Sequence, residues 1–199
     1  EKTKCIVVWG KNPAESFPPV WAALNRIKKA GAKVITIDPR FTDTAKLSDI
    51  WLQIRPGTDC ALGLSWLNVI VQEGLYDKDF VKNYTVGFDE LAEHVKQYSP
   101  EKVSKITLIP AKRIVESARM YATTKPARIL WGVKLDQLGN NATQAIRTQC
   151  IIRAVTGNLD VEGGDLLGVG KEIMQAVSDR ELELNEKLPS AQRSKQLGA

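Results

Sequence analysis

The chain has 199 residues and a formal net charge of +5, and 43% of its residues are hydrophobic and 26% charged. These values are ordinary for a globular protein of one domain, or one and a part, with a sizeable core. No apolar run approaches the ~20 residues of a membrane-spanning helix, and the basic residues are scattered without interleaved aromatics, so we expect neither a membrane span nor a nucleic-acid partner.

The beginning of the chain predicts a strand, a helix and a second strand. Residues 4–9 are a continuous apolar run, which is typical of a strand buried on both faces. A tight turn is expected over residues 10–17, because glycine and asparagine tolerate positive φ and proline cannot continue a sheet. Prolines in the first turn favour a helix from about residue 18 to residue 30, and residues 33–37 are the second strand. This order predicts a βαβ unit with parallel strands.

The spacing of this unit resembles that of a dinucleotide-binding unit. Gly10 and Asp38 are separated by close to the ~30 residues that such a unit spans. The Gly-x-Gly-x-x-Gly fingerprint is missing, however, because the first turn has a single glycine followed by asparagine and proline. This departure counts against NAD as the ligand.

A third strand is expected at residues 49–54, where the chain is again apolar. Pro56 and Gly57 form a turn after it, and Thr58 or Asp59 can cap the long apolar helix that follows. The N-terminus of this helix would face the strand ends with unpaired N–H groups and a partial positive charge.

The rest of the chain predicts helices, one more strand and a tail. Residues 76–124 have an amphipathic helical pattern, and we expect a helical insertion that packs on the sheet. Residues 127–132 return to a buried strand, and residues 143–155 to a helix. The prediction is therefore an α/β fold, a parallel sheet flanked by helices, over residues 1–165, with a partly helical or disordered tail over residues 166–199.

Polar loops follow three of the predicted strands. They span residues 10–17, 38–42 and 55–59. Ligands of open parallel sheets bind beyond the carboxyl ends of the strands, so we expect these loops to form three walls of one site. Each loop alone would be interpreted as turn and cap residues. Three together at one edge of a sheet favour a site for a nucleotide-bearing cofactor.

The residue types in these loops suit a nucleotide. Gly10 lets the backbone approach a phosphate, and the amide of Asn12 can donate hydrogen bonds to phosphate or sugar oxygens. Arg40 can hold an anionic group in a bidentate fork. A carboxylate such as Asp38 or Asp59 can accept two N–H donors from a guanine edge, or ribose hydroxyls.

The sequence contains no convincing catalytic centre. His94 lies in an amphipathic helical pattern, where an exposed position is expected, and Lys11 is expected to be a charged loop residue. The cysteines Cys5, Cys60 and Cys150 are far apart and lack metal-ligand spacing, so we expect three buried free thiols. We therefore predict no catalytic residue and no metal ligand in this chain.

Short motifs run along residues 5–167 in a specific order and spacing. They are Gly10-Lys11-Asn12-Pro13, Ile37-Asp38-Pro39-Arg40, Thr44-Ala45, Arg55-Pro56-Gly57-Thr58-Asp59-Cys60-Ala61-Leu62, Gly74-Leu75-Tyr76-Asp77, Phe80-Val81, Thr85-Val86-Gly87-Phe88, Trp131-Gly132, Thr156-Gly157-Asn158 and Gly163-Gly164. In these motifs the chain resembles the third domain of the molybdopterin-guanine-dinucleotide oxidoreductases of the dimethyl sulfoxide reductase family.

The resemblance implies a Rossmann-like α/β domain that binds the guanosine half of one of two pterin-guanine dinucleotides. Residues 10–17 would contact the pyrophosphate, residues 38–42 the ribose and phosphate side, and residues 57–59 the guanine. Asp59 would be the base-reading carboxylate, and Gly132 matches a family loop near the pterin. The cofactor-binding residues implied by the resemblance are Gly10, Lys11, Asn12, Pro13, Ser16, Asp38, Pro39, Arg40, Thr42, Gly57, Thr58, Asp59 and Gly132.

The same resemblance implies a larger enzyme around this chain. The chain begins at Glu1 rather than at methionine, and we expect it to be a segment of a longer protein. The parent would be a molybdopterin-dependent oxidoreductase that moves an oxygen atom or a hydride equivalent at a molybdenum or tungsten centre outside this chain. An iron–sulfur cluster would lie in a preceding domain. The partners would be the remaining domains and iron–sulfur electron-transfer subunits, and the segment alone is expected to be inactive.

Two alternatives stay open at this point. One is an NAD-type nucleotide-binding module, although its fingerprint is absent. The other is a non-catalytic structural subunit that kept the fold and lost the cofactor, although the polar loop residues are intact.

Overall fold

The computed structural model of the chain describes residues 2–133, 135, 141–166 and 189. The chain divides after Leu166 into two compact units, and all of the elements below belong to the first. Apart from Leu166 and Pro189, the predicted tail lies outside the described residues.

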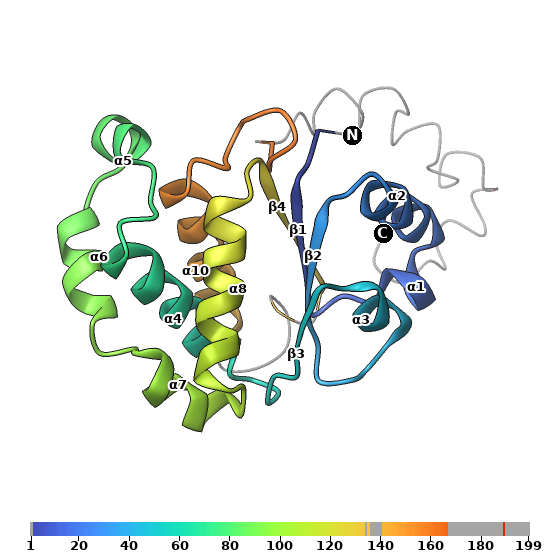
Figure 1. Cartoon of the computed structure of the whole chain (residues 1–199), viewed down its shortest axis with the longest axis horizontal. Coiled ribbons are helices and arrows are strands. Elements are labelled where there is room, and N and C mark those ends of the chain that lie inside the picture. Colours follow the sequence, from blue (N-terminus) through green and yellow to red (C-terminus); the bar gives the residue numbers. More distant parts are fainter. Residues whose placement is uncertain (1, 134, 136–140, 167–188, 190–199) are drawn as a thin grey trace. The chain divides into compact units, whose positions relative to one another are not determined.

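In the described part of the chain the sheet has four strands, and all neighbours are parallel (Figure 1). The strands are β1 (Cys5–Trp9), β2 (Lys33–Ile37), β3 (Ile50–Leu52) and β4 (Ala127–Trp131), in the order β3-β2-β1-β4. The predicted α/β fold with a parallel sheet is confirmed. Trp9 is in register with Ile37 on one side and with Trp131 on the other, so the three longer strands end level.

Strand β3 is shorter than the predicted range of residues 49–54. The backbone N–H of Asp38 donates to the carbonyl of Leu52 at 3.2 Å, but the N–H of Arg40, the next that could face β3, donates to Oδ1 of Asp38 instead. Ile54 is nevertheless buried. The apolar pattern therefore continues past the end of strand pairing.

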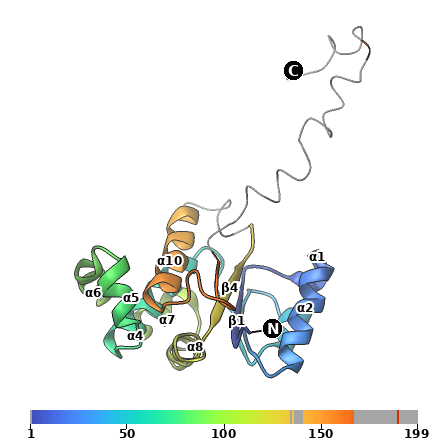
Figure 2. The ribbon, with the colours of Figure 1, turned by 90° about the horizontal axis from the view of Figure 1, so that it is seen from above.

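Helices cover both faces of the sheet (Figures 1 and 2). One face carries α1 (Pro13–Ser16), α2 (Pro18–Lys29) and α3 (Asp43–Leu47), and the other carries α4 (Asp59–Gln72), α8 (Ala111–Thr123) and α10 (Ala142–Val155), with α5 (Lys78–Tyr84), α6 (Phe88–Val95) and α7 (Pro100–Thr107) packed around them. Side chains of β1 alternate between these layers. Ile6 and Val8 pack toward α2, whereas Val7 and Trp9 belong to the larger cluster with α4 and α8.

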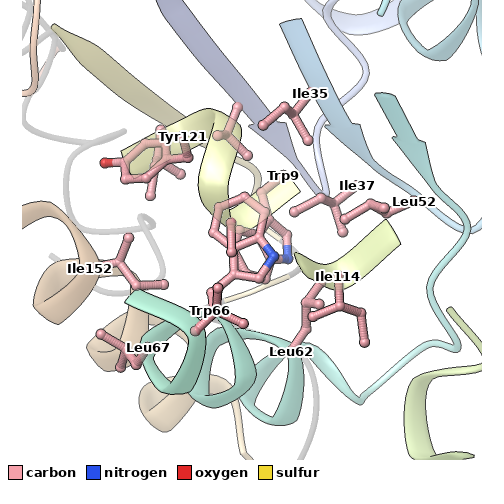
Figure 3. Close-up of a cluster of buried hydrophobic side chains, with 14 of the residues drawn as sticks. Trp9, Ile35, Ile37, Leu52, Leu62, Trp66, Leu67, Ile114, Tyr121 and Ile152 are labelled. Carbon is pink, nitrogen blue, oxygen red and sulfur yellow. The ribbon is translucent and has the colours of Figure 1, made fainter. Parts of the chain in front are cut away.

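The larger cluster joins α4 to the sheet (Figure 3). The ring centroids of Trp9 and Trp66 lie 5.5 Å apart, and the ring of Tyr121 lies 5.8 Å from that of Trp66. All three side chains are fully buried, and buried aromatic rings contribute large apolar areas to a core. The stack therefore holds α4 against the end of β1.

The predicted helical insertion over residues 76–124 is confirmed, since α5 to α8 occupy it. Two polar contacts tie these helices to α4. Nδ2 of Asn68 donates to the carbonyl of Val95 at 2.9 Å, and Arg119 donates to both carboxylate oxygens of Glu73 at 2.7 and 2.8 Å. None of the helices in the described part of the chain is long and apolar enough to cross a membrane.

The prediction of three buried thiols is wrong for two of them. Cys5 is buried, Cys60 is half-buried and Cys150 is exposed. Helix α10 buries the polar side chains of Thr148 and Gln149 together with Ile152 and Val155, so its inward face is only partly apolar.

Candidate functional site

The loop after β1 is a strand-to-helix turn built around Asn12. Pro13 begins α1, a helix that the tight turn expected over residues 10–17 did not include. Proline is favoured at this position because the first helical N–H needs no partner. The carbonyl of Asn12 accepts the N–H of Ser16 at 3.0 Å and its hydroxyl at 2.9 Å. Asn12, Pro13 and Ser16, three of the predicted site residues, thus form one hydrogen-bonded turn.

The loops after β1 and β4 touch through two glycines. Gly10 has a φ of 59°, and its N–H donates to the carbonyl of Ile37 at 2.9 Å. The N–H of Gly132 donates to the carbonyl of Trp9 at 3.0 Å, and a Cβ at Gly132 would lie 2.0 Å from the carbonyl oxygen of Gly10. Only glycine at position 132 lets the two backbones approach this closely.

A buried hydrogen bond joins the first loop to α3, the helix that follows the second loop. The hydroxyl of Thr44, in α3, donates to Oδ1 of Asn12 at 2.7 Å. Thr44 is fully buried and Asn12 is 9% exposed. Nδ2 of Asn12 is buried, and no described residue accepts a hydrogen bond from it. A buried donor without a partner costs about 1–3 kcal/mol, and an acceptor atom from a ligand or an ordered water would remove this cost.

The second loop is held in shape by Asp38 and Thr42, both of which are buried. Oδ1 of Asp38 accepts the N–H of Arg40 at 2.8 Å, and its carbonyl accepts the indole N–H of Trp51 at 2.9 Å. The hydroxyl oxygen of Thr42 caps α3 by accepting an N–H of its first turn at 3.2 Å. Pro39 and Arg40 are exposed at the tip of the loop. Asp38 and Thr42 therefore shape the turn and cap α3, and Arg40 is exposed to solvent at the tip of the loop.

The third loop places a carboxylate at the start of α4. Gly57 has a φ of 83°, a conformation that favours glycine. The hydroxyl of Thr58 donates to the carbonyl of Arg55 at 2.7 Å and does not cap the helix. Asp59 is the first residue of α4, and its Oδ1 accepts the indole N–H of Trp9 at 2.8 Å. The third loop is thereby joined to the end of β1.

Cationic side chains border these loops. Nζ of Lys11 lies 5.7 Å from the centre of the Phe17 ring. Nη2 of Arg40 lies 3.6 Å from Oε2 of Glu15, and both side chains are exposed. Exposed ion pairs contribute at most about 1 kcal/mol, so an anionic ligand can displace Glu15 from Arg40. This border favours a ligand that carries phosphate.

The thiol that follows Asp59 in the sequence is kept in its neutral form. Burial raises the pKa of the Cys60 thiol, and the charge of the neighbouring Asp59 raises it further, so a reactive thiolate is disfavoured here. His94 is exposed on α6. Among the residues that the structure describes, no three histidine, cysteine or acidic side chains gather to hold a metal ion.

The structure brings the three predicted loops and Gly132 to one edge of the sheet. Two residues that join them, Thr44 and Trp9, were not among the predicted site residues. Thr44 belongs to one of the motifs, which was a usable signal, whereas Trp9 had only the pattern of a core residue. Their hydrogen bonds to Asn12 and Asp59 span 32 and 50 positions of the sequence.

Comparison with known proteins gives consistent matches. The sequence model of a family described as "Molybdopterin oxidoreductase" matches residues 1–197. The acetylene hydratase of Syntrophotalea acetylenica is 42% identical over 201 residues, which cover 98% of this chain and 26% of that protein. The F420-dependent formate dehydrogenase subunit alpha of Methanocaldococcus jannaschii is 42% identical over 163 residues, which cover 82% of this chain and 24% of that protein.

A solved structure matches the fold as well. The structure of acetylene hydratase from Pelobacter acetylenicus is similar with a TM-score of 0.76 and 44% sequence identity, over 78% of this chain and 22% of that chain. The chain spans about a quarter of the length of the curated relatives named above.

Proposed function

Because the chain belongs to the molybdopterin oxidoreductase family, as the match over residues 1–197 shows, we propose that it binds the guanosine and pyrophosphate half of one molybdopterin guanine dinucleotide. Membership confirms the resemblance found in the sequence and implies a molybdopterin cofactor with molybdenum or tungsten. The dinucleotide form and the binding residues are the proposal. In it, the chain is a cofactor-binding domain, over residues 1–165, of a larger oxidoreductase whose metal centre lies outside this chain.

The proposal rests on two side chains in the joined loops at the carboxyl edge of the sheet, a hydrogen-bond donor and a carboxylate. Asn12 has a buried amide donor without a partner among the described residues. Asp59 has its carboxylate at the start of α4, on the loop joined to the end of β1. An amide donor suits a phosphate or sugar oxygen, and a carboxylate suits the N–H groups of a guanine edge. Groups whose chemistry suits both halves of a guanine nucleotide therefore lie at the edge where ligands of parallel sheets bind.

The loops divide the ligand between them in this proposal. Residues 10–17 hold the pyrophosphate, residues 38–42 the ribose and its phosphate, and residues 57–59 the guanine. Gly132 keeps the loop after β4 close to Gly10, so that both can line the cofactor. When bound, the cofactor supplies the redox chemistry at its metal, while the residues of this chain bind and orient it.

The named relatives indicate no single substrate, since one is an acetylene hydratase and another a formate dehydrogenase subunit alpha. We therefore place the substrate-selecting residues outside this chain. The name "subunit alpha" supports partner subunits for the complete enzyme, and iron–sulfur electron-transfer subunits are the kind that the proposal requires.

Titration of the full chain with GDP, ADP and NADH tests the proposal, because GDP carries the guanosine and the two phosphates of the cofactor half. We expect GDP to bind more tightly than ADP or NADH. Asp59→Asn should weaken GDP binding by about 1–3 kcal/mol, the usual effect of losing a charged hydrogen-bond partner, and should not weaken ADP binding. Asp89→Asn is the matched control, since Asp89 is an exposed acid in the first turn of α6.

Two outcomes would count against the proposal. Tighter binding of NADH than of GDP would favour an NAD-type module, and the absence of binding by all three nucleotides would favour a structural subunit. Unchanged GDP affinity in Asp59→Asn would overturn the guanine assignment alone.

A further inference from the structure

We propose that Trp9 is a positioning residue for guanine selectivity, because its buried indole N–H holds the Asp59 carboxylate in the orientation that receives the base. This inference rests on the proposed function. Trp9 is the last residue of a buried strand, and its packing alone would account for a large aromatic side chain there. The hydrogen bond to Asp59 is the feature that packing does not require.

Trp9 is held from several sides. Its backbone is paired with Ile37 in β2 and with Trp131 in β4, and its carbonyl accepts the N–H of Gly132 at 3.0 Å. Its side chain is fully buried and packs on Trp66 in the core shown in Figure 3. Close-packed interiors keep such side chains in one rotamer. The indole N–H therefore has a fixed direction.

This fixed donor meets Asp59 where α4 begins. Nε1 of Trp9 donates to Oδ1 of Asp59 at 2.8 Å. A buried indole N–H without an acceptor is costly, so the bond is favoured whether or not a ligand is present. An aspartate has two rotatable side-chain bonds, and the hydrogen bond contributes to restricting them before the ligand arrives. Binding then loses less side-chain entropy.

The same restriction favours guanine over adenine. Guanine offers two N–H donors to a carboxylate, whereas adenine would set its N1 lone pair against the same oxygen atoms. A carboxylate that can rotate away relieves this repulsion, and one held by a fixed donor cannot. Trp9 therefore increases selectivity in two ways. It keeps the carboxylate in place to attract guanine, and it keeps the same carboxylate in place to repel adenine.

The neighbouring indole supplies a matched control. Trp66 is also fully buried and belongs to the same cluster. Its Nε1 has no hydrogen-bond partner within the described residues. Trp9→Phe and Trp66→Phe thus remove equivalent atoms from one core, but only the first removes the bond to Asp59. A purely structural role for both rings predicts the same effect from both variants.

The test measures the affinities of the full chain and of the two variants for GDP and for ADP. We expect Trp9→Phe to weaken GDP binding about threefold to tenfold, which corresponds to the cost of ordering one side chain on binding, without weakening ADP binding. Trp66→Phe should keep the native ratio of the two affinities. The inference is overturned if Trp9→Phe keeps the native ratio, or if both variants lose it equally. A native chain that does not prefer GDP overturns the proposed function, and this inference with it.

A second measurement decides the question if Trp9→Phe does not fold. The indole N–H resonances of the native chain can be followed by nuclear magnetic resonance during the two titrations. We expect GDP to shift the Trp9 resonance more than ADP does, because only guanine binds the other partner of this hydrogen bond. Equal shifts of the Trp9 resonance with GDP and ADP would overturn the inference.

Discussion

The contact between the loops after β1 and β4 predicts a large loss of stability for Gly132→Ala. The added Cβ would lie 2.0 Å from the carbonyl oxygen of Gly10, 2.8 Å from its carbonyl carbon and 3.1 Å from Cα of Lys11. All three are backbone atoms, so no flexible side chain can move aside. Cβ atoms essentially never approach other atoms to less than 3.0 Å, and the two loops would have to separate.

The size of the loss follows from what resists this separation. The N–H of Gly10 donates to Ile37 at 2.9 Å, and that of Gly132 donates to Trp9 at 3.0 Å. Overpacking a close-packed position costs about 1–3 kcal/mol, and one lost hydrogen bond adds about 1 kcal/mol. We therefore expect Gly132→Ala to lower the free energy of unfolding by about 2–4 kcal/mol.

Urea denaturation of the full chain, followed by tryptophan fluorescence, measures this loss. Gly57→Ala is the control, because a Cβ there would meet nothing within 4 Å and only the φ of 83° is penalised. That penalty is about 1–2 kcal/mol. If Gly132→Ala loses no more stability than Gly57→Ala, the argument from close backbone approach is refuted.

Two further predictions concern residues away from the loops. Arg153→Met should lower the free energy of unfolding by about 2–3 kcal/mol in urea denaturation, because it removes two hydrogen bonds. Nε of Arg153 donates to Oδ2 of the largely buried Asp165 at 2.8 Å, and Nη2 donates to the carbonyl of Ile129 at 3.1 Å. Asp165 would keep the N–H of Ile129 at 3.0 Å and Arg128 at 3.5 Å. A loss below about 1 kcal/mol, typical of an exposed pair, would contradict this. A thiol reagent at about pH 8 should label the exposed Cys150 in the native chain and leave Cys5 unlabelled, since burial raises the pKa of Cys5 to about 12. Equal labelling rates would show that Cys5 is accessible.

The sequence locates a strand well when its buried residues are the same residues that pair with neighbouring strands. Strands β1 and β2 are covered by helices on both faces, and each is a mostly apolar run that ends at a polar loop. The end of β3 could not be located in this way. Ile54 is buried although it lies beyond the end of the strand, and an apolar pattern reports burial alone.

The inward face of α10 shows a second limit. The pattern predicted that Cys150 points inward, but the structure buries Thr148 and Gln149 and leaves Cys150 exposed. Helix α10 packs on α4 where Gly63 leaves room, since a Cβ at Gly63 would lie 2.3 Å from the hydroxyl oxygen of Thr148. A small residue on the partner helix thus sets the rotation of α10, and hydrophobicity along α10 does not reveal it.

The sequence by itself determined where the candidate site lies. Each apolar run ends at a polar loop, and parallel strands place all of their carboxyl ends at one edge of the sheet. Only the tertiary structure decided which side chains meet there. Asn12 bonds Thr44 and Trp9 bonds Asp59 across 32 and 50 positions. Such pairs form because strand order and register bring distant residues within hydrogen-bond distance. Local sequence patterns do not predict these contacts.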